Sequence, residues 1–333
     1  MFILQSYLLA VIFCFITMLC WGSWANTQKL ARKEWRFELF YWDYVIGVLL
    51  LSILLAITLG SMGTSGRPFF QDIGQAEFSN IVSAMIGGAI FNVANILLVA
   101  AIAIAGMSVA FPVGIGIALV LGVLLNYKVT PIGNPIILFL GVALVVAAII
   151  LDAAAYKKLP SQAKGVSTKG LSLSVLCGVL MGFFYRFVAS SMSTDFINLE
   201  TGKLSPYTAV FIFSVGVFVS NFIVNTIVMK KPFVGKPVSI SQYFKGGLRI
   251  HSFGILGGII WCVGMSFSLI ASGQAGFAIS YGLGQGATMI AALWGVFVWK
   301  EFKDASPGTN KLIASMFFCF VSGLALIIIA RLT

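Results

Sequence analysis

The sequence predicts an all-α polytopic membrane protein with ten transmembrane helices, arranged as two five-helix halves in an inverted repeat. Composition is the first observation: 59% of the 333 residues are hydrophobic and only 9% are charged. The second is a series of ten apolar stretches of about 20 residues, each long enough to cross about 30 Å of hydrocarbon. The third is the concentration of Lys and Arg in alternate loops. The net charge of +11 therefore reflects membrane topology, so the lipid bilayer is the expected partner and nucleic acid is excluded.

The ten expected spans are separated by short loops. They are predicted at residues 5–27, 38–60, 79–104, 107–126, 134–153, 170–191, 206–229, 250–271, 275–299 and 310–331. The first lacks the N-terminal Lys or Arg of a signal peptide and is longer than an ordinary signal-peptide core, so it is expected to remain as a span. No expected loop is long enough to fold separately, and the membrane bundle is expected to be the whole protein.

The distribution of basic residues predicts the orientation. With ten spans the two termini share a side, and the terminal side carries only Arg67, Lys128, Lys203 and Arg331. The positive-inside rule therefore places both termini on the non-cytoplasmic side of a plasma (inner) membrane. The opposite loops hold sixteen basic residues: Lys29, Arg32, Lys33, Arg36, Lys157, Lys158, Lys164, Lys169, Lys230, Lys231, Lys236, Lys245, Arg249, Lys300, Lys303 and Lys311.

Two similar stretches indicate an internal repeat. A short turn at 104–107 leads into the glycine-containing run 110–116, and a turn at 271–274 leads into the similar run 277–284. We expect a first half at 1–155, a basic cytoplasmic linker at 156–169 and a second half at 170–333. Because five spans is an odd number, the second half enters the membrane inverted, as in many secondary transporters whose site lies near the midplane.

Polar side chains at membrane depth are the candidate binding residues. They are costly in lipid and are expected to face a partner or a wet cavity. Helical spacing places Asn92 with Asn95, and Tyr281 with Gln285 and Thr288, on shared faces. Such faces suit a small polar, uncharged solute, although the same amides can instead bond neighbouring helices. The further candidates are Asn221, Asn225, Trp261 and Ser280.

Three ionisable residues near or inside spans have two interpretations each. Arg186, beside Tyr185, either extends its charge to the interface or binds a carbonyl-rich or anionic ligand. Asp43 either couples transport to protons or pairs with the basic loop. His251, the only histidine, is expected at the membrane interface rather than in a proton relay.

Several other classes of protein are excluded. The five cysteines lie in apolar segments without nearby histidines, so no metal or disulfide framework is expected. The Gly282–Gly286 run lacks a phosphate-binding lysine and lies in a span, so neither a nucleotide cofactor nor an enzyme is expected. A channel requires a charge ring or filter, and a receptor or scaffold a soluble domain or long tails; none of these is visible.

The end of the first span, Cys20-Trp21-Gly22-Ser23-Trp24-Ala25-Asn26-Thr27-Gln28-Lys29, and Trp42-Asp43-Tyr44 carry a family resemblance. With ten short spans in two halves, the chain resembles the drug/metabolite transporter superfamily, in particular its ureide permease branch and, less closely, its glucose/ribose and rhamnose uptake branches. The resemblance implies proton-coupled import of small polar nutrients, with functional roles for Trp21, Trp24, Asn26, Asp43 and Tyr44. One departure is the short linker 156–169, because plant ureide permeases have a long central loop with a nucleotide-binding-like motif.

Together these features predict a secondary-active permease that imports a ureide- or nucleobase-like solute by alternating access. H⁺ is the expected co-substrate, with Na⁺ as the alternative, and either a monomer or a homodimer fits. A pentose or hexose permease is the alternative function. Export of cationic drugs is less favoured, because it calls for a buried carboxylate and the first span has no acidic residue.

Overall fold

Ten helical segments of the described chain are long and apolar enough to cross a membrane. A computed structural model describes residues 1–31, 35–159 and 167–333, and the predicted all-helical, ten-span architecture is confirmed over these residues. The basic residues Arg32, Lys33 and Lys164 lie outside them. The spans are formed by α1 (Tyr7–Ser23) with α2 (Asn26–Leu30), α3 (Phe37–Ile57), α5 (Phe78–Ala105), the π-helical η1 (Phe111–Ile115) with α7 (Gly116–Val129), α8 (Pro135–Tyr156), α9 (Thr168–Ser191), α10 (Pro206–Lys230), α12 (Leu248–Ala275), α13 (Phe277–Gly284) with α14 (Ala287–Leu293) and the π-helical η3 (Trp294–Val298), and α15 (Thr309–Ile329).

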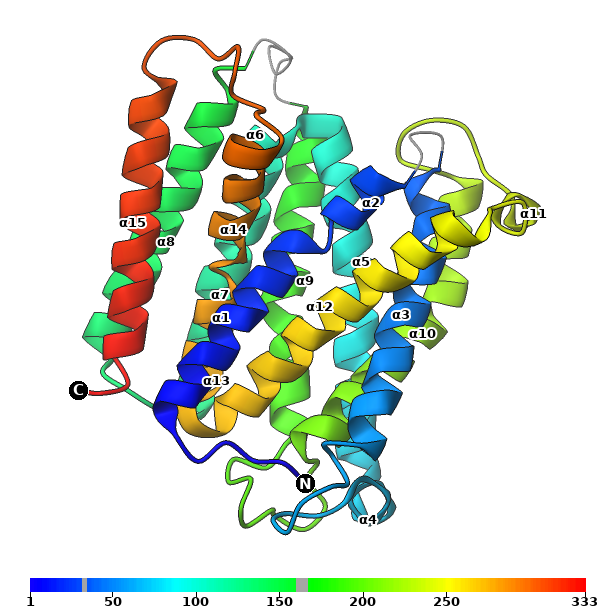
Figure 1. The fold of residues 1–333 in the computed structure, drawn as a ribbon, viewed down its shortest axis with the longest axis vertical. Coiled ribbons are helices and arrows are strands. Elements are labelled where there is room, and N and C mark those ends of the chain that lie inside the picture. The colour runs from blue at the N-terminus through cyan, green and yellow to red at the C-terminus, as the bar shows by residue number, and fades with distance from the viewer. Residues whose placement is uncertain (32–34, 160–166) are drawn as a thin grey trace.

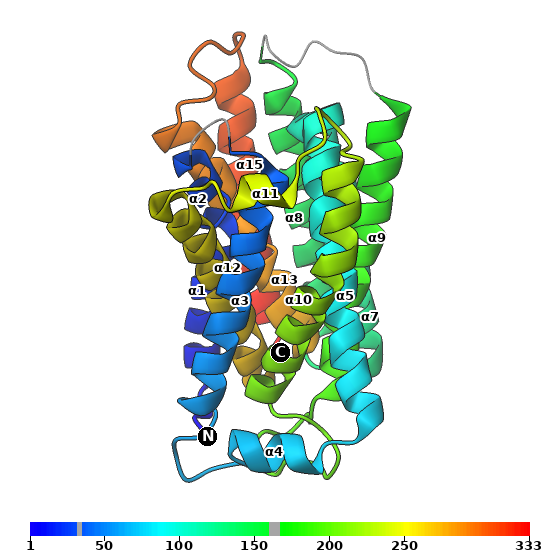
Figure 2. The ribbon, with the colours of Figure 1, turned by 90° about the vertical axis from the view of Figure 1, so that its right-hand side faces the viewer.

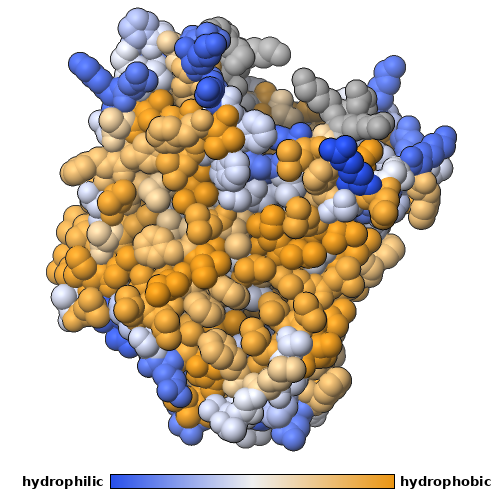
Figure 3. All heavy atoms as spheres, in the orientation of Figure 1, coloured by the Kyte–Doolittle hydropathy of each residue, from blue (hydrophilic) through white to orange (hydrophobic). Residues whose placement is uncertain are grey.

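The two ends of the bundle differ in charge and in the loops they carry. Both termini and the short helix α4 (Phe69–Gln75) lie toward one end, whereas α2 and the short helix α11 (Ile240–Tyr243) lie toward the other (Figures 1 and 2). On the face seen in Figure 3, a broad apolar band lies between these ends, with hydrophilic residues gathered above and below it. We call the two ends the terminal end and the basic end, because most Lys and Arg residues lie at the latter.

Glycines set the closest helix crossings. Where α3 crosses α12, a Cβ on Gly47 or Gly258 would collide with a backbone carbonyl of the other helix. The crossing of α5 with α10 has the same construction, with Gly88 and Gly216 in the equivalent places. Small residues allow this approach in a membrane, where no hydrophobic force brings helices together. At the edge of the bundle, α8 and α15 lie side by side (Figure 1).

Three of the spans are interrupted, although hydropathy predicted ten continuous apolar segments. The first bends at Trp24–Ala25 between α1 and α2, and the ninth breaks at Gln285–Gly286 between α13 and α14. In the fourth, α6 (Met107–Ala110) leads into η1, where Pro112 has no N–H to continue the α-helical bonding. Irregular backbone at membrane depth is tolerated where it is buried or lines a cavity.

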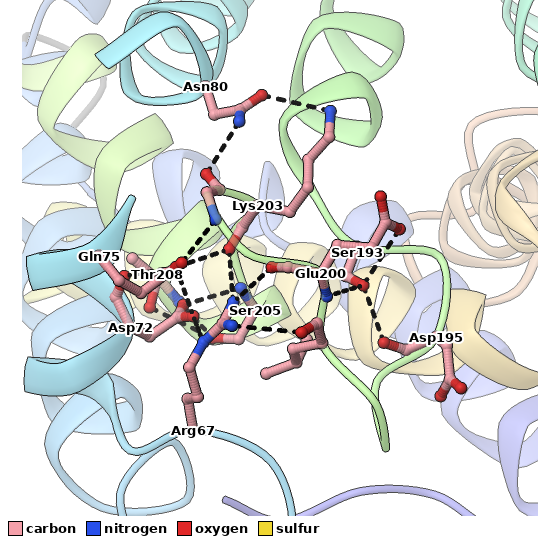
Figure 4. Close-up of polar contacts among 12 residues, drawn as sticks. Arg67, Asp72, Gln75, Asn80, Ser193, Asp195, Glu200, Lys203, Ser205 and Thr208 are labelled. Atoms are coloured by element: carbon pink, nitrogen blue, oxygen red, sulfur yellow. Dashed lines mark hydrogen bonds and ion pairs between the residues drawn. The ribbon is translucent and has the colours of Figure 1, made fainter. Parts of the chain in front are cut away.

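A polar network closes the terminal end (Figure 4). Arg67 donates to Asp72 at 3.0 Å and to the backbone carbonyls of Leu199, Glu200 and Lys203. The Asp72 carboxylate is fully buried and also accepts from the Ser205 N–H at 2.8 Å. The network therefore ties the loop that contains α4 to the loop between α9 and α10.

Replacing Arg67 with alanine is expected to weaken this closure. The change leaves the buried Asp72 carboxylate without its charged donor, so we expect a loss of about 2 kcal/mol in the free energy of unfolding. Thermal unfolding of the detergent-purified protein measures the change. Lys128→Ala removes a charge from the same end, where Lys128 contacts no described acid, and equal stability of the two variants would contradict the prediction.

Candidate functional site

A cavity of about 300 Å³ lies between the first, third, fourth, sixth, eighth and ninth spans. It begins near mid-membrane at Trp261 and Phe184 and extends toward the basic end, where Gln28 and Ile102 lie on its wall. The remaining lining residues are Trp21, Gly22, Trp24, Ala25, Phe91, Asn95, Leu98, Val99, Phe111, Ile115, Met181, Gln285, Ala287, Thr288 and Ala291. The bend in the first span and the break in the ninth both border this cavity.

Aromatic rings form much of its wall. The ring of Trp261 stacks on Trp21 at 5.9 Å between centroids and lies 4.2 Å from Phe91. Trp24 packs against Tyr44 at 4.8 Å, and the Trp21 indole N–H donates to the Trp261 carbonyl at 3.3 Å. These contacts hold large flat surfaces in place, which suits stacking against a planar ligand.

The polar groups of the wall are neutral. Asn95 donates to the Tyr41 hydroxyl at 3.3 Å, and Thr288 donates to the Gln285 carbonyl at 3.0 Å. The side-chain amides of Gln28 and Gln285 make no hydrogen bond to any described residue, which leaves their donors and acceptors available. Among the described residues no charged side chain lines the cavity, so the wall fits a neutral polar solute better than an ion.

The terminal end of the cavity is sealed by buried hydroxyl groups. Tyr185 and Ser268 share a hydrogen bond of 3.1 Å, and Ser280 donates to the Ser268 carbonyl at 2.6 Å. The hydroxyl of Tyr281 reaches the carbonyls of Ala118 and Met181 at 3.2 and 3.1 Å. These contacts join α7, α9, α12 and α13, so the cavity is closed toward the terminal end and extends toward the basic end.

The structure brings some of the predicted site residues together and separates others. Asn92 donates to Ser220 at 2.9 Å between α5 and α10, and Asn26 accepts from Trp299 at 2.7 Å. Arg186 is half-buried outside the cavity, and Asn221 is buried without a hydrogen-bond partner among the described residues. Tyr185 and Tyr281 belong to the seal. The predicted residues that line the cavity are Trp21, Trp24, Asn95, Trp261, Gln285 and Thr288.

Several residues that line the cavity were not predicted from the sequence. Gln28 lies within the stretch that carries the family resemblance but was given no role there, and Phe91, Met181 and Phe184 carry no signal that separates them from ordinary apolar positions. The short distance of Gln28 from the Trp21–Trp24 pair in the sequence was the one available indication.

Asp43 lies apart from the cavity, in a second polar cluster at the basic end. Its carboxylate accepts from the Tyr243 hydroxyl at 2.6 Å, and the Nδ1 atom of His251 lies 2.9 Å from Oδ2. Among the described residues its ionisable basic partner is therefore His251 rather than a Lys or Arg of the basic loops. Burial, with the neighbouring Asp43 carboxylate, raises the pKa of Tyr243, so its hydroxyl remains a proton donor to Asp43 at physiological pH.

Ten spans, six of which border a cavity without a charged side chain among the described residues, describe a multi-pass integral membrane protein with the architecture of a solute transporter. The chain belongs to the ureide permease family, whose family model matches residues 40–169 and 162–330. This membership assigns it to the transporters rather than to the enzymes.

Individual relatives agree with this assignment. The chain is 24% identical to ureide permease 1 of Arabidopsis thaliana over 98% of each chain, and 24% identical to ureide permease 2 of the same plant, again over 98% of each. Transmembrane protein 144 homolog A of Dictyostelium discoideum is 25% identical over 52% of this chain and 42% of its own. A solved structure whose title reads only "Crystal structure of protein" shares the fold. It superimposes with a TM-score of 0.59 at 15% identity, over 98% of this chain and 99% of its own.

Proposed function

We propose that the protein is a secondary-active permease that imports a small, neutral, ureide- or nucleobase-like nutrient together with protons. The observation that carries the proposal is the cavity wall, which combines aromatic faces with the amides of Gln28, Asn95 and Gln285 and has no charged group among the described residues. A ureide is a compact, uncharged molecule rich in N–H and C=O groups. Amide side chains offer both the donors and the acceptors that such a molecule requires.

The same proposal includes alternating access by two inverted halves, residues 1–155 and 170–333, joined by the linker 156–169. The matching glycine crossings of α3 with α12 and of α5 with α10 support a repeat. Further support comes from Gly106 and Gly276, which end α5 and α12 with φ of +77° and +82°. In this mechanism the halves rock about the central site and expose it to each side in turn.

The orientation and state follow from charge and from the position of the cavity. With the basic end in the cytoplasm of a plasma (inner) membrane, both termini lie outside. The cavity then extends toward the cytoplasm, and the Tyr185–Ser268–Ser280 seal and the Arg67 network lie on the outer side. In the proposed cycle we therefore assign this conformation to the inward-facing state.

Ligand-dependent thermal stabilisation tests the proposed substrate class. The detergent-purified protein is heated with allantoin, nucleobases, nucleosides, pentoses, hexoses or cationic dyes. A ligand at about 100 times its Kd adds roughly 2.7 kcal/mol to the folded state if it binds only that state. We expect stabilisation by allantoin or a nucleobase. Stabilisation by sugars alone would favour a sugar permease, and stabilisation by dyes alone would overturn the importer proposal.

A further inference from the structure

An ionisable cluster lies at the basic end, outside the cavity and where α3 meets α12. Asp43 is 1% exposed, and its two oxygens lie 3.0 and 2.9 Å from Nδ1 of His251, which is 19% exposed. Tyr243 of α11 donates to the same carboxylate at 2.6 Å. The ring of Trp35 packs edge-on against His251 at 5.5 Å. The cluster thus connects three helices through one carboxylate.

The geometry assigns different roles to the two ring nitrogens of His251. An ionised carboxylate only accepts hydrogen bonds, so Nδ1 carries a hydrogen and donates it to Asp43. Nε2 makes no hydrogen bond to a described residue and lies against Gly246 in the loop at the basic end, where a Cβ would approach it to 2.5 Å. Nε2 is therefore the atom at which this imidazole gains or loses a proton.

Comparison of the two glycine crossings shows that packing does not require this charged pair. Asp43 lies four residues before Gly47, and Ile212 lies four residues before Gly216 in the other crossing. His251 lies seven residues before Gly258, and Ile81 lies seven residues before Gly88. The equivalent positions are thus both isoleucine. A buried ion pair is a weak source of stability compared with apolar packing, and ionisable residues in membrane spans are commonly functional.

The crossing also provides room for the carboxylate. A Cβ on Gly254 would collide with Cβ of Asp43, and the equivalent position in the α5 crossing, four residues before Gly88, is Ala84. The close approach of Asp43 to α12 thus depends on glycine at the facing position.

Among the described residues, Asp43 and His251 form ion pairs only with each other. Among the described residues no other charged side chain bonds to either of them. The charged residues on the neighbouring elements are Arg36 and Glu38, which pair with each other, and Lys230, Lys245 and Arg249, which have no described acidic partner. Among the described residues, His251 is therefore the group whose charge state decides whether the buried carboxylate is neutralised.

We propose that His251, held by Asp43, is the site at which this transporter binds and releases its coupling proton. A proton on Nε2 makes His251 a cation that neutralises Asp43 and holds α3, α11 and α12 together at the basic end. Its release into water leaves an uncompensated carboxylate in the crossing, which weakens the packing there. This inference rests on the proposed function, which supplies both the transported solute and the coupling to protons, whereas the protonation of His251 can be measured independently of transport.

Because His251 is the only histidine, nitrogen-15 histidine NMR reports on this site alone, provided that the purification tag contains no histidine. In the absence of solute, we expect the ring signals to change from the charged to the neutral form as the pH is raised across the range in which the protein stays folded. Saturating allantoin is expected to shift the midpoint, because coupling between two ligands is reciprocal. A ring that stays in one form throughout this range would overturn the proposal, whether or not allantoin binds.

Transport by proteoliposomes supplies the second readout. An inward proton gradient is expected to drive allantoin accumulation by the wild type. His251→Gln and Asp43→Asn are expected to reduce the accumulation ratio to about one while exchange of internal and external allantoin stays measurable. Arg249→Gln removes a neighbouring charge on the same helix and is expected to keep the wild-type pH profile.

The outcomes separate the two proposals. Wild-type accumulation by His251→Gln would remove His251 from coupling. Absence of both accumulation and exchange in the wild type would instead contradict the proposed substrate class, and the NMR titration would then decide the proton site.

The double variant Asp43→Ile/His251→Ile copies the residues of the other crossing. We expect it to remain folded but to lose gradient-driven accumulation, whereas coupled transport by it would overturn the inference.

Discussion

Replacing Gly258 with alanine is expected to remove most of the folded protein. The new Cβ would collide with the backbone carbonyl oxygen of Tyr44, where α12 crosses α3. A backbone atom cannot move aside as the end of a side chain can, so we expect a loss of about 3 kcal/mol or more, above the usual cost of overpacking. The measurement is thermal unfolding together with size-exclusion recovery in detergent.

Gly116→Ala is the matched control for this change. Gly116 begins α7 inside the bundle, but a Cβ there meets no atom within 4 Å. This variant is therefore expected to unfold at or above the wild-type temperature, since alanine favours the helix by up to about 1 kcal/mol. If the two variants unfold alike, close approach at the α3–α12 crossing does not control stability.

Replacing Gln285 with alanine is expected to lower the affinity for allantoin about tenfold, while the protein remains folded. Its amide lies at the break in the ninth span and has no hydrogen-bond partner among the described residues. One lost hydrogen bond to a solute is worth about 1.4 kcal/mol, which corresponds to a factor of ten. Quenching of tryptophan fluorescence measures the affinity, because three tryptophans line the cavity.

Asn92→Ala is the matched control, because it removes a side-chain amide that lies outside the cavity. Asn92 bonds to Ser220 between α5 and α10, and its carbonyl oxygen has no described partner. Its loss is expected to change the stability by about 1 kcal/mol or less and to leave allantoin affinity unchanged. Equal loss of affinity in both variants would place the binding site elsewhere or point to a general change of structure.

The number and approximate limits of the spans were predictable from the sequence because lipid imposes a strong local constraint. About 20 apolar residues must be consecutive to cross a bilayer. The fifth span, predicted at 134–153, is α8 (Pro135–Tyr156), and the seventh, predicted at 206–229, is α10 (Pro206–Lys230). Starts were accurate where Asn134 or Ser205 caps a helix that begins with proline. Breaks inside the fourth and ninth spans were missed, because hydropathy does not report backbone bonding.

The candidate site was only partly predictable. Spacing placed Asn92 and Asn95 on one helical face, but helices pack around both, and only Asn95 reaches the cavity. The cavity-lining aromatic residues Phe91 and Phe184 look like ordinary core residues in the sequence. Membrane-depth polarity identifies candidates, whereas the direction of each side chain depends on the neighbouring helix.

The sequence by itself determined the family and the ten spans, since these depend on local composition and order. Only the tertiary structure decided which residues share the cavity and which seal its terminal end. It also paired Asp43 with His251, which lie on different helices and far apart in the chain. The physical reason is that such pairs form only when glycines let two helices cross closely, a contact that no local pattern encodes.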